Sequence, residues 1–292
     1  MLTDTEEIKL ALKANEVRRL VISMLEKAGS GHSAGSLGMA DIFVFLYFHA
    51  MNHWPQDPSW VYRDYFLLSN GHICPVQYAT MALSGYFDKQ ELFTLRELGS
   101  RLQGHPHRTV LPGIEMSSGP LGSGLSQAVG MAYADKKYNK KFGRYFFTLM
   151  GDGELNEGVV WESALHAGKE KLGNLIVIVD RNNIQIDGYT HEVMPLEPLK
   201  AKWESFNFHC IDVSGHDFRA LDEAIEEAKS FKHKPTAIIA HTVPGKGVSF
   251  MENDPSWHGK PPDKSQAQKA LKELEKQRQR LEKQLKELTD KN

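Results

Sequence analysis

The spacing of apolar residues along the chain predicts five buried strands separated by helices. Short, continuous apolar runs occupy residues 65–69, 145–150, 175–180, 209–213 and 236–243. Apolar residues recur at helical spacing over residues 5–28 and near 38–50, 73–85, 122–140, 157–171 and 217–231. Strands that are apolar throughout are typical of a parallel sheet with both faces covered. The predicted fold class is therefore α/β, with a mostly parallel sheet and helices on both faces.

A change in composition near residue 263 divides the chain into two predicted parts. Pro261-Pro262-Asp263 marks the boundary, so residues 1–263 are predicted to form one large domain. Residues 264–292 hold nine Lys or Arg and five Asp or Glu but no Gly, Pro or aromatic residue, which favours a charged amphipathic helix. Its leucines repeat at spacings of three and four, so the helix can form a short coiled coil or dock on its own domain.

Composition and charge narrow the range of partners. Hydrophobic residues make up 41% of the 292 residues and charged residues 25%, as in ordinary globular proteins. The formal net charge of −2 argues against nucleic acid or an anionic membrane as a main partner. No apolar run reaches the roughly 18 residues of a membrane span, and the acidic N-terminus lacks a signal-peptide core. Because Cys74 and Cys210 are too few for a disulfide framework, we expect a cytoplasmic protein.

Two polar clusters follow neighbouring predicted strands and indicate a ligand site. Gly151-Asp152-Gly153 follows the strand at 145–150, and Asn182 follows the strand at 175–180. Ligands of open parallel sheets bind at the carboxyl ends of the strands, where glycines let backbone amides approach a phosphate. The Asp152 carboxylate and the Asn182 amide oxygen suit Mg²⁺. The Gly-Asp-Gly turn alone could equally be a helix cap, but with Asn182 it predicts a magnesium-bridged diphosphate.

This spacing resembles that of thiamine-diphosphate enzymes, and over residues 8–262 the sequence is similar to the amino-terminal half of transketolases. The resemblance implies bound thiamine diphosphate and Mg²⁺, for which Ca²⁺ or Mn²⁺ can substitute. It implies a metal site at Asp152, Asn182 and Ile184 and a cofactor site that includes Asp152, Gly153 and Asn182. Deoxyxylulose-phosphate synthase shares the motif and is the nearest alternative. The Gly-His-Pro turn at 104–106 and the segment from 245 to 259 resemble transketolase instead.

Four histidines beside glycines in separate predicted loops are candidates for substrate chemistry. Imidazoles donate or accept protons near neutral pH, and an adjacent glycine keeps the path to the ring open. The transketolase resemblance implies that His32 contacts the sugar, that His72 reaches the cofactor diphosphate and that His105 faces the donor carbonyl. It places His258 between diphosphate and substrate, with catalytic and cofactor-binding roles. The Ser-Ala pair after His32 departs from the usual Pro-Gly of the family.

A loop rich in glycine and serine at 117–126 leads into the helix predicted at 122–140. Its composition alone favours a loop that opens a helix. In transketolases the equivalent segment grips the cofactor's pyrimidine, so the resemblance implies that Gly119, Pro120 and Leu121 bind the cofactor. Glu157 takes the position of a family glutamate that communicates between paired cofactor sites. Without the resemblance, Glu157 would be a first-turn helix residue favoured by the helix dipole.

The resemblance ends near the point where the pyrimidine-binding domain of a transketolase would begin. It implies that this chain is one subunit of a split transketolase, completed by a C-terminal subunit in an α2β2 heterotetramer. The expected reaction transfers a two-carbon ketol unit from a ketose phosphate to an aldose phosphate, as in the pentose phosphate pathway. One alternative is a related ketol transferase for another sugar. Another is a noncatalytic assembly or regulatory subunit, which the basic tail would suit.

Overall fold

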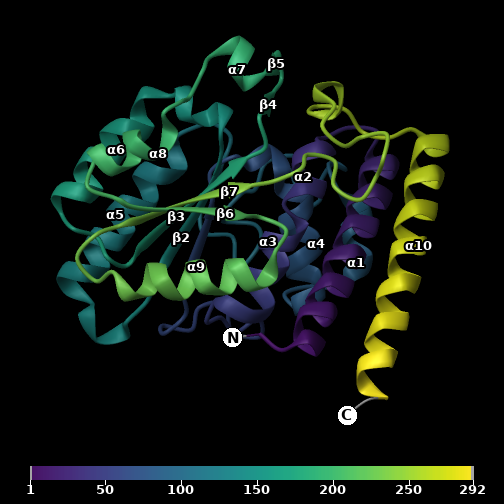
Figure 1. Cartoon of the computed structure of the whole chain (residues 1–292), viewed down its shortest axis with the longest axis horizontal. Helices are drawn as coiled ribbons and strands as arrows, with labels where there is room; N and C mark the ends of the chain where they lie inside the picture. The colour runs from purple at the N-terminus through teal and green to yellow at the C-terminus, as the bar shows by residue number, and fades with distance from the viewer. Residues whose placement is uncertain (1, 291–292) are drawn as a thin grey trace.

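The computed structural model describes residues 2–290 and contains the predicted α/β sheet (Figure 1). Five parallel strands lie in the order β1-β2-β3-β7-β6. Their bounds are Tyr65–Leu68 for β1, Phe146–Gly151 for β2, Leu175–Arg181 for β3, His209–Ser214 for β6 and Thr236–His241 for β7. The five strands predicted from the apolar runs are confirmed, each to within two residues.

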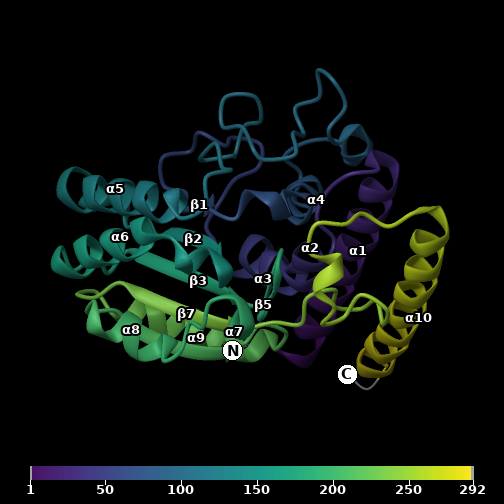
Figure 2. The same ribbon diagram turned by 90° about the horizontal axis from the view of Figure 1, so that it is seen from above.

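Side chains of each strand alternate between two hydrophobic cores, one on each face of the sheet. Phe147 and Ile178 belong to one core, and their neighbours Phe146 and Val177 belong to the other. Figure 2 shows the two helical layers from above. The first core is covered by α1 (Asp4–Ala28), α3 (Ala40–Phe45), α4 (Cys74–Ser84) and α9 (Phe218–Ser230), the second by α5 (Ser123–Tyr138), α6 (Gly158–Lys169) and α8 (Leu199–Ser205). Burial on both faces explains why the strands contain few polar positions.

The helix predicted over residues 38–50 is divided in the structure. It is present as α3 followed by a π-helical turn (Leu46–Ala50), and a separate short helix, α2 (Ala34–Gly38), precedes it. The backbone passes so close to the loop after β7 that a Cβ at Gly38 would lie 2.9 Å from the Val243 carbonyl oxygen. Periodicity also missed short elements that carry too few residues for a repeat, namely β4 (Ile184–Gln185), β5 (Gly188–Tyr189), α7 (Thr190–Val193) and α8.

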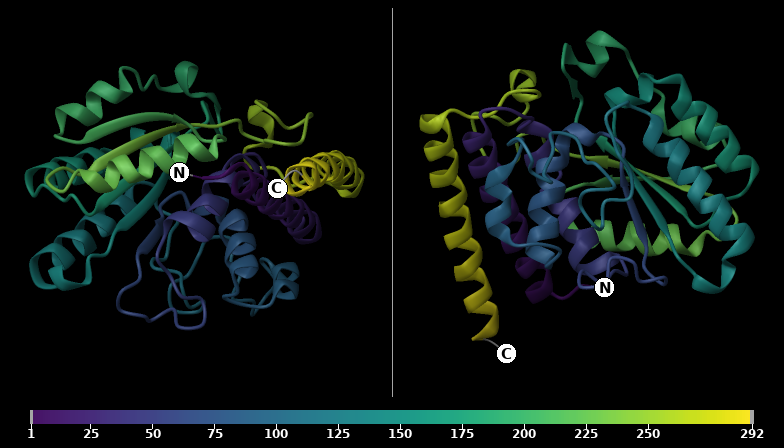
Figure 3. Two further views of the ribbon diagram at one scale, coloured as in Figure 1. Left: turned by 60° about the horizontal axis from the view of Figure 1, so that its bottom comes forward. Right: turned by 180° about the vertical axis from the view of Figure 1, so that it is seen from behind.

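The last helix, α10 (Lys264–Thr289), lies along α1 on the outer side of the molecule (Figures 1 and 3). Asp263 and Gln266 begin it with a capping box. Ala267, Ala270 and Leu274 are buried in the core that α1 also lines. Asn15 Nδ2 in α1 donates a hydrogen bond to the Leu274 carbonyl oxygen at 2.9 Å. The charged tail therefore docks on its own domain in this chain.

Two further expectations concern the thiols and the membrane. Cys74 and Cys210 are both free and buried, in agreement with the absence of a disulfide framework. Burial raises the pKa of each thiol to about 12, so both remain protonated near neutral pH. Between residues 2 and 290, no helix is both long enough and apolar enough to cross a bilayer.

Candidate active site

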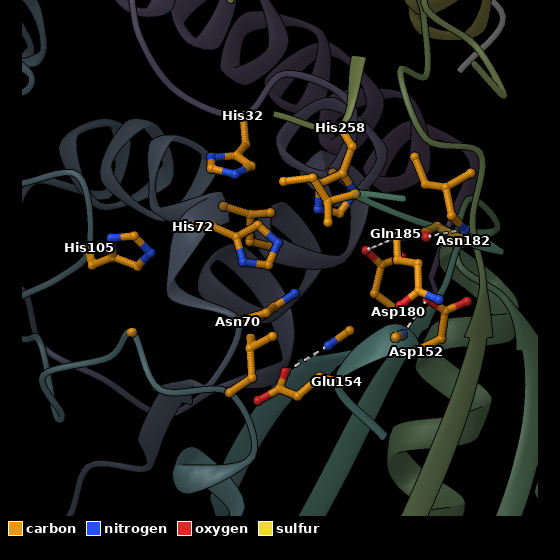
Figure 4. A pocket seen from close by; sticks show the side chains of 18 residues that line it. His32, Asn70, His72, His105, Asp152, Glu154, Asp180, Asn182, Gln185 and His258 are labelled. Atoms are coloured by element: carbon orange, nitrogen blue, oxygen red, sulfur yellow. Dashed lines mark hydrogen bonds between the residues drawn. The ribbon is translucent and has the colours of Figure 1, made fainter. Parts of the chain in front are cut away.

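A pocket of about 350 Å³ opens where the loops after β1, β2 and β3 meet (Figure 4). These three strands are parallel neighbours, so their carboxyl ends lie at one edge of the sheet. His72, Asp152 and Asn182 reach the pocket from these loops, and His32, His105 and His258 reach it from loops outside the sheet. The predicted Gly119, Leu121, Gly153 and Ile184 also line it. The fold thus brings together most of the residues that the sequence singled out.

Asp152 is a buried carboxylate held in one orientation at the end of β2. Its Oδ1 accepts the Gly153 N–H at 2.8 Å, and its Oδ2 accepts the Asn183 N–H at 2.7 Å. Oδ2 also accepts a hydrogen bond from Arg181 Nη1 at 2.9 Å. Burial raises the pKa of Asp152, and these donors act in the opposite direction. Asp152 therefore offers an oriented oxygen to the pocket, as a hard cation requires.

The Asn182 amide is oriented by hydrogen bonds on both sides. Its Nδ2 donates to Asp180 Oδ2 at 2.7 Å, and its Oδ1 accepts the Ile184 N–H at 3.0 Å. Asp180 is buried, accepts a second hydrogen bond from the Thr242 hydroxyl, and has its pKa raised to about 7, mainly by burial. Among residues 2–290, no three His, Cys, Asp or Glu side chains cluster so that they could hold a metal. A cation beside Asp152 and Asn182 would therefore need further oxygens from a bound ligand.

The glycine amides of the Gly-Asp-Gly turn are already paired in this structure. Gly153 N–H donates to Asp152, and Gly151 N–H donates to Glu154 Oε2 at 3.0 Å. In this structure neither of these two amides is free to donate to a phosphate. Gly153 instead leaves room for a neighbour, because a Cβ there would lie 3.1 Å from the Gln185 side chain. The turn is both a ligand wall and the helix cap that the sequence also allowed.

Glu154 is a buried carboxylate that no pattern in the sequence singles out as a site residue. It is 3% exposed and accepts hydrogen bonds from the Ser69 hydroxyl, the Gly122 N–H at 2.6 Å and the Gly151 N–H at 3.0 Å. These donors belong to the loop after β1, the loop before α5 and the end of β2. Burial is the main cause that raises its pKa to about 6. The only signal in the sequence was a glutamate directly after the Gly-Asp-Gly segment, and glutamates are more often exposed.

Three histidines pack against one another on one wall of the pocket. The ring centroids of His32 and His72 are 4.8 Å apart, those of His72 and His258 are 5.4 Å apart, and those of His32 and His258 are 5.8 Å apart. Burial, assisted by the other histidines, lowers the pKa of His32 to about 4 and that of His72 to about 3. Burial also lowers the pKa of His258. All three rings are therefore neutral near pH 7, each with one N–H donor and one nitrogen acceptor.

His105 lines the pocket apart from this group (Figure 4). Burial lowers its pKa, and the nearby Arg96 guanidinium lowers it further. Arg96 also donates from Nη1 to the Ser30 hydroxyl at 2.7 Å, which ties the His32 loop to the turn before His105.

The loop before α5 meets the pocket only in part. Gly119 and Leu121 line the pocket, whereas Pro120 is exposed and lies outside the lining. Gly122 has φ 82° and a Cβ there would lie 2.7 Å from the Val159 side chain, so this position requires glycine. Glu157 is exposed at the N-cap of α6 and also lies outside the lining. The structure does not bring these two predicted residues into the pocket.

Several buried polar atoms of the pocket show that it suits a polar ligand. His32 Nδ1, Asn70 Oδ1 and Gln185 Nε2 have no hydrogen-bond partner within the part of the chain that the structure describes. Buried polar atoms are normally paired in folded proteins. His32 Nδ1 and Gln185 Nε2 can donate to the oxygens of a diphosphate, and the Asp152 and Asn182 oxygens can face its cation. The residues present therefore fit the group that the sequence predicted.

Comparisons with known proteins bear on the family and the fold of this chain. The family described as "Transketolase, thiamine diphosphate binding domain" matches residues 10–284. The chain is 40% identical to the 6-deoxy-6-sulfo-D-fructose transketolase subunit SqwG of Clostridium sp., over 93% of this chain and 98% of that subunit. It is 38% identical to one subunit of the apulose-4-phosphate transketolase of Phocaeicola vulgatus, over 94% of this chain and 96% of that subunit.

A solved structure shows the same fold. The crystal structure of a transketolase from Campylobacter jejuni superposes with a TM-score of 0.86 at 35% identity. The match covers 94% of this chain but only 43% of that transketolase. The chain thus spans less than half of that transketolase and nearly the whole length of the two subunits named above.

Proposed function

This chain belongs to the transketolase family, and from that premise we propose that it is the thiamine-diphosphate-binding subunit of a two-subunit transketolase. The observation that carries the proposal is the convergence of Asp152, Asn182 and four histidines in one pocket. Its near full-length match to two named transketolase subunits supports a separate partner that supplies the other half. An α2β2 assembly, a cytoplasmic location and a place in the pentose phosphate pathway are parts of the same proposal.

Asp152, Asn182 and Ile184 would hold Mg²⁺ against the diphosphate, and Ca²⁺ or Mn²⁺ would substitute. His72, Gly119, Leu121 and Gly153 would contact the cofactor. When bound there, thiamine diphosphate would supply the nucleophilic and electron-sink chemistry that ketol transfer requires. The protein contributes positioning, exclusion of water and oriented hydrogen bonds.

The neutral histidines define what this subunit does for the sugar. A neutral imidazole can donate one hydrogen bond to a sugar oxygen and accept a proton at its other nitrogen. His32 and His258 would hold the sugar hydroxyls beside the reacting carbon, and His105 would face the donor carbonyl. Their lowered pKa values keep them from carrying positive charge in the pocket near pH 7. They would therefore orient oxygens and pass protons without repelling the cation.

The proposal is tested by reconstitution with a pyrimidine-domain subunit. The isolated chain with thiamine diphosphate and Mg²⁺ should show negligible turnover, and the assembled enzyme should transfer a ketol unit from a ketose phosphate to an aldose phosphate. Fructose 6-phosphate, 6-deoxy-6-sulfofructose and apulose 4-phosphate form a suitable donor panel, because the relatives' names contain the last two sugars. Substantial activity of the chain alone would contradict the split-subunit proposal.

Two variants test the assigned roles in the assembled enzyme. Asp152→Ala should abolish cofactor retention and leave the fold intact, as measured by calorimetry and circular dichroism. Unchanged Mg²⁺-dependent cofactor binding would disprove the metal assignment. His105→Ala should lower ketose turnover more than cofactor affinity, and the opposite pattern would disprove its role.

A noncatalytic assembly or regulatory subunit is the second candidate function. Its support is the basic α10 helix, but this helix is docked along α1 and does not stand free. A related ketol transferase acting on another sugar remains the alternative within the enzyme class, and the donor panel distinguishes it. Binding of thiamine diphosphate by the reconstituted complex separates the enzyme from the noncatalytic subunit.

A further inference from the structure

Arg181, at the end of β3, pairs with the proposed metal ligand Asp152 and has no role in the proposed reaction. Its side chain is 9% exposed. Nη1 donates to Asp152 Oδ2 at 2.9 Å and to the Thr190 hydroxyl at 3.0 Å. Nη2 donates to Glu197 Oε1 at 3.1 Å. The guanidinium therefore joins the end of β3 to α7 and to the turn before α8.

This arrangement keeps the positive charge against Asp152. Thr190 is buried, and Glu197 is itself held because its second carboxylate oxygen accepts the Leu199 N–H at 2.8 Å. An arginine in such a network must give up several hydrogen bonds together to move away. The ion pair is thus a built part of the site.

A guanidinium paired with the carboxylate that faces the pocket opposes binding of a metal cation to that carboxylate. The Arg181 guanidinium compensates the negative charge of Asp152, and it repels a divalent ion bound on the other side of that carboxylate. Even with the screening of water, a unit charge and a divalent ion at such a separation change the affinity by roughly tenfold. An anionic diphosphate reverses the balance, because its charges attract the metal more strongly than one guanidinium repels it.

We propose that Arg181 makes cation binding depend on the diphosphate: the pocket binds a divalent ion weakly by itself and takes it up together with the anionic cofactor. The proposal rests on the metal site assigned under the proposed function. Arg181 is a positioning residue in this scheme, since it acts through Asp152. This dependence gives the buried arginine beside the proposed metal ligand a role in binding.

The test is a Mn²⁺ titration of the full-length chain without thiamine diphosphate, with free Mn²⁺ measured by electron paramagnetic resonance. Arg181→Gln should bind Mn²⁺ at least about tenfold more tightly than the wild type, and Arg181→Lys should stay near the wild type. Arg144→Gln is the matched control, because Arg144 also forms a buried ion pair, with Asp135, at side-chain exposures of 10% and 6%. It should leave Mn²⁺ affinity unchanged.

Equal Mn²⁺ affinities of wild type and Arg181→Gln would overturn the proposal, as would a gain that persists after Asp152→Asn is added. Loss of the gain in that double variant supports it. If Arg181→Gln does not fold, Thr190→Val offers the same test, because it loosens the guanidinium with a nearly isosteric change and should tighten Mn²⁺ binding by a smaller factor. Cofactor retention by Asp152→Ala in the assembled enzyme would instead overturn the metal site, whatever the result for Arg181.

Discussion

Replacing Glu154 by alanine should strongly destabilise this protein, because one buried carboxylate joins three loops of the pocket. The substitution leaves the Ser69 hydroxyl, the Gly122 N–H and the Gly151 N–H without their acceptor. All three belong to segments that line or support the cofactor pocket. The loss should therefore affect both the free energy of unfolding and the affinity for the cofactor.

The magnitude follows from the contacts and from the pKa of Glu154. Each buried donor left unpaired costs about 1–3 kcal/mol, so three donors cost about 6 kcal/mol. Burial opposes the charge of Glu154, since its pKa rises from 4.5 to about 6, which corresponds to roughly 2 kcal/mol recovered when the carboxylate is removed. The expected net loss at pH 7.5 is about 4 kcal/mol, within the range for broken buried networks.

The loss should depend on pH in a defined direction. The pKa of Glu154 is higher in the folded than in the unfolded chain, so protonation of this carboxyl stabilises the fold. This contribution to the free energy of unfolding is fully present below about pH 4.5 and is lost as the pH rises through about 6. The stability difference between wild type and Glu154→Ala should therefore be about 1 kcal/mol larger at pH 5 than at pH 7.5.

Urea unfolding followed by circular dichroism measures both quantities. Glu162→Ala is the control, because Glu162 is exposed on α6 and its removal should change stability by less than about 0.5 kcal/mol. A loss below about 1 kcal/mol for Glu154→Ala, or a difference that grows with rising pH, would refute the reasoning.

Three further predictions concern other parts of the molecule. In the cofactor-free chain, the NMR chemical shifts of the His32 and His72 rings should change little between pH 5 and 8, because burial lowers their pKa values to about 4 and 3. An NMR titration midpoint near pH 6.5 for either ring would contradict this. The free energy of unfolding should fall as the pH drops below about 6.5, because the unfolded chain then binds protons that the buried rings do not. Ile186, Tyr189, Val193 and Met194 are exposed apolar side chains of one segment, and Ile186 also lines the pocket, so we expect this segment to be a docking surface for the proposed partner subunit. Val193→Glu should therefore weaken assembly with that subunit in analytical ultracentrifugation. Leu98→Glu, on a fully exposed leucine of another turn, should not, and equal effects would argue against this docking surface. Leu274→Ala should lower the free energy of unfolding by about 2–4 kcal/mol in urea, since this side chain is buried between α10 and the domain; a change below about 1 kcal/mol would show that α10 contributes little.

Much of the fold was readable from local patterns, since strands buried on both faces must be apolar throughout. All five parallel strands were predicted from such runs, and α1, α4, α5, α6 and α9 match predicted helices. The helical pattern near 38–50 is confirmed by α3 and the π-helical turn that follows it, but the separate α2 and the change to π-helical winding at Leu46 were not predicted. The short β4, β5, α7 and α8 were missed because they hold too few residues for periodicity.

Candidate site residues were found where chemistry and spacing coincide. Asp152 and Asn182 follow adjacent strands, and a parallel sheet brings the ends of such strands together whatever the loops contain. The same rule could not decide which amides are free. Only the structure shows that Gly151 and Gly153 donate to carboxylates of their own turn.

By itself the sequence determined the class of fold, the edge of the sheet that carries the site and the residue types available there, because these follow from patterns within a few residues. The tertiary structure decided how these residues act. The bond from Ser69 to Glu154 spans 85 positions, and the contact that docks α10 spans 259. Burial then set the protonation of His32 and His72 and paired Arg181 with Asp152. Desolvation and charge pairing depend on which groups meet in space, and only the folded chain specifies that.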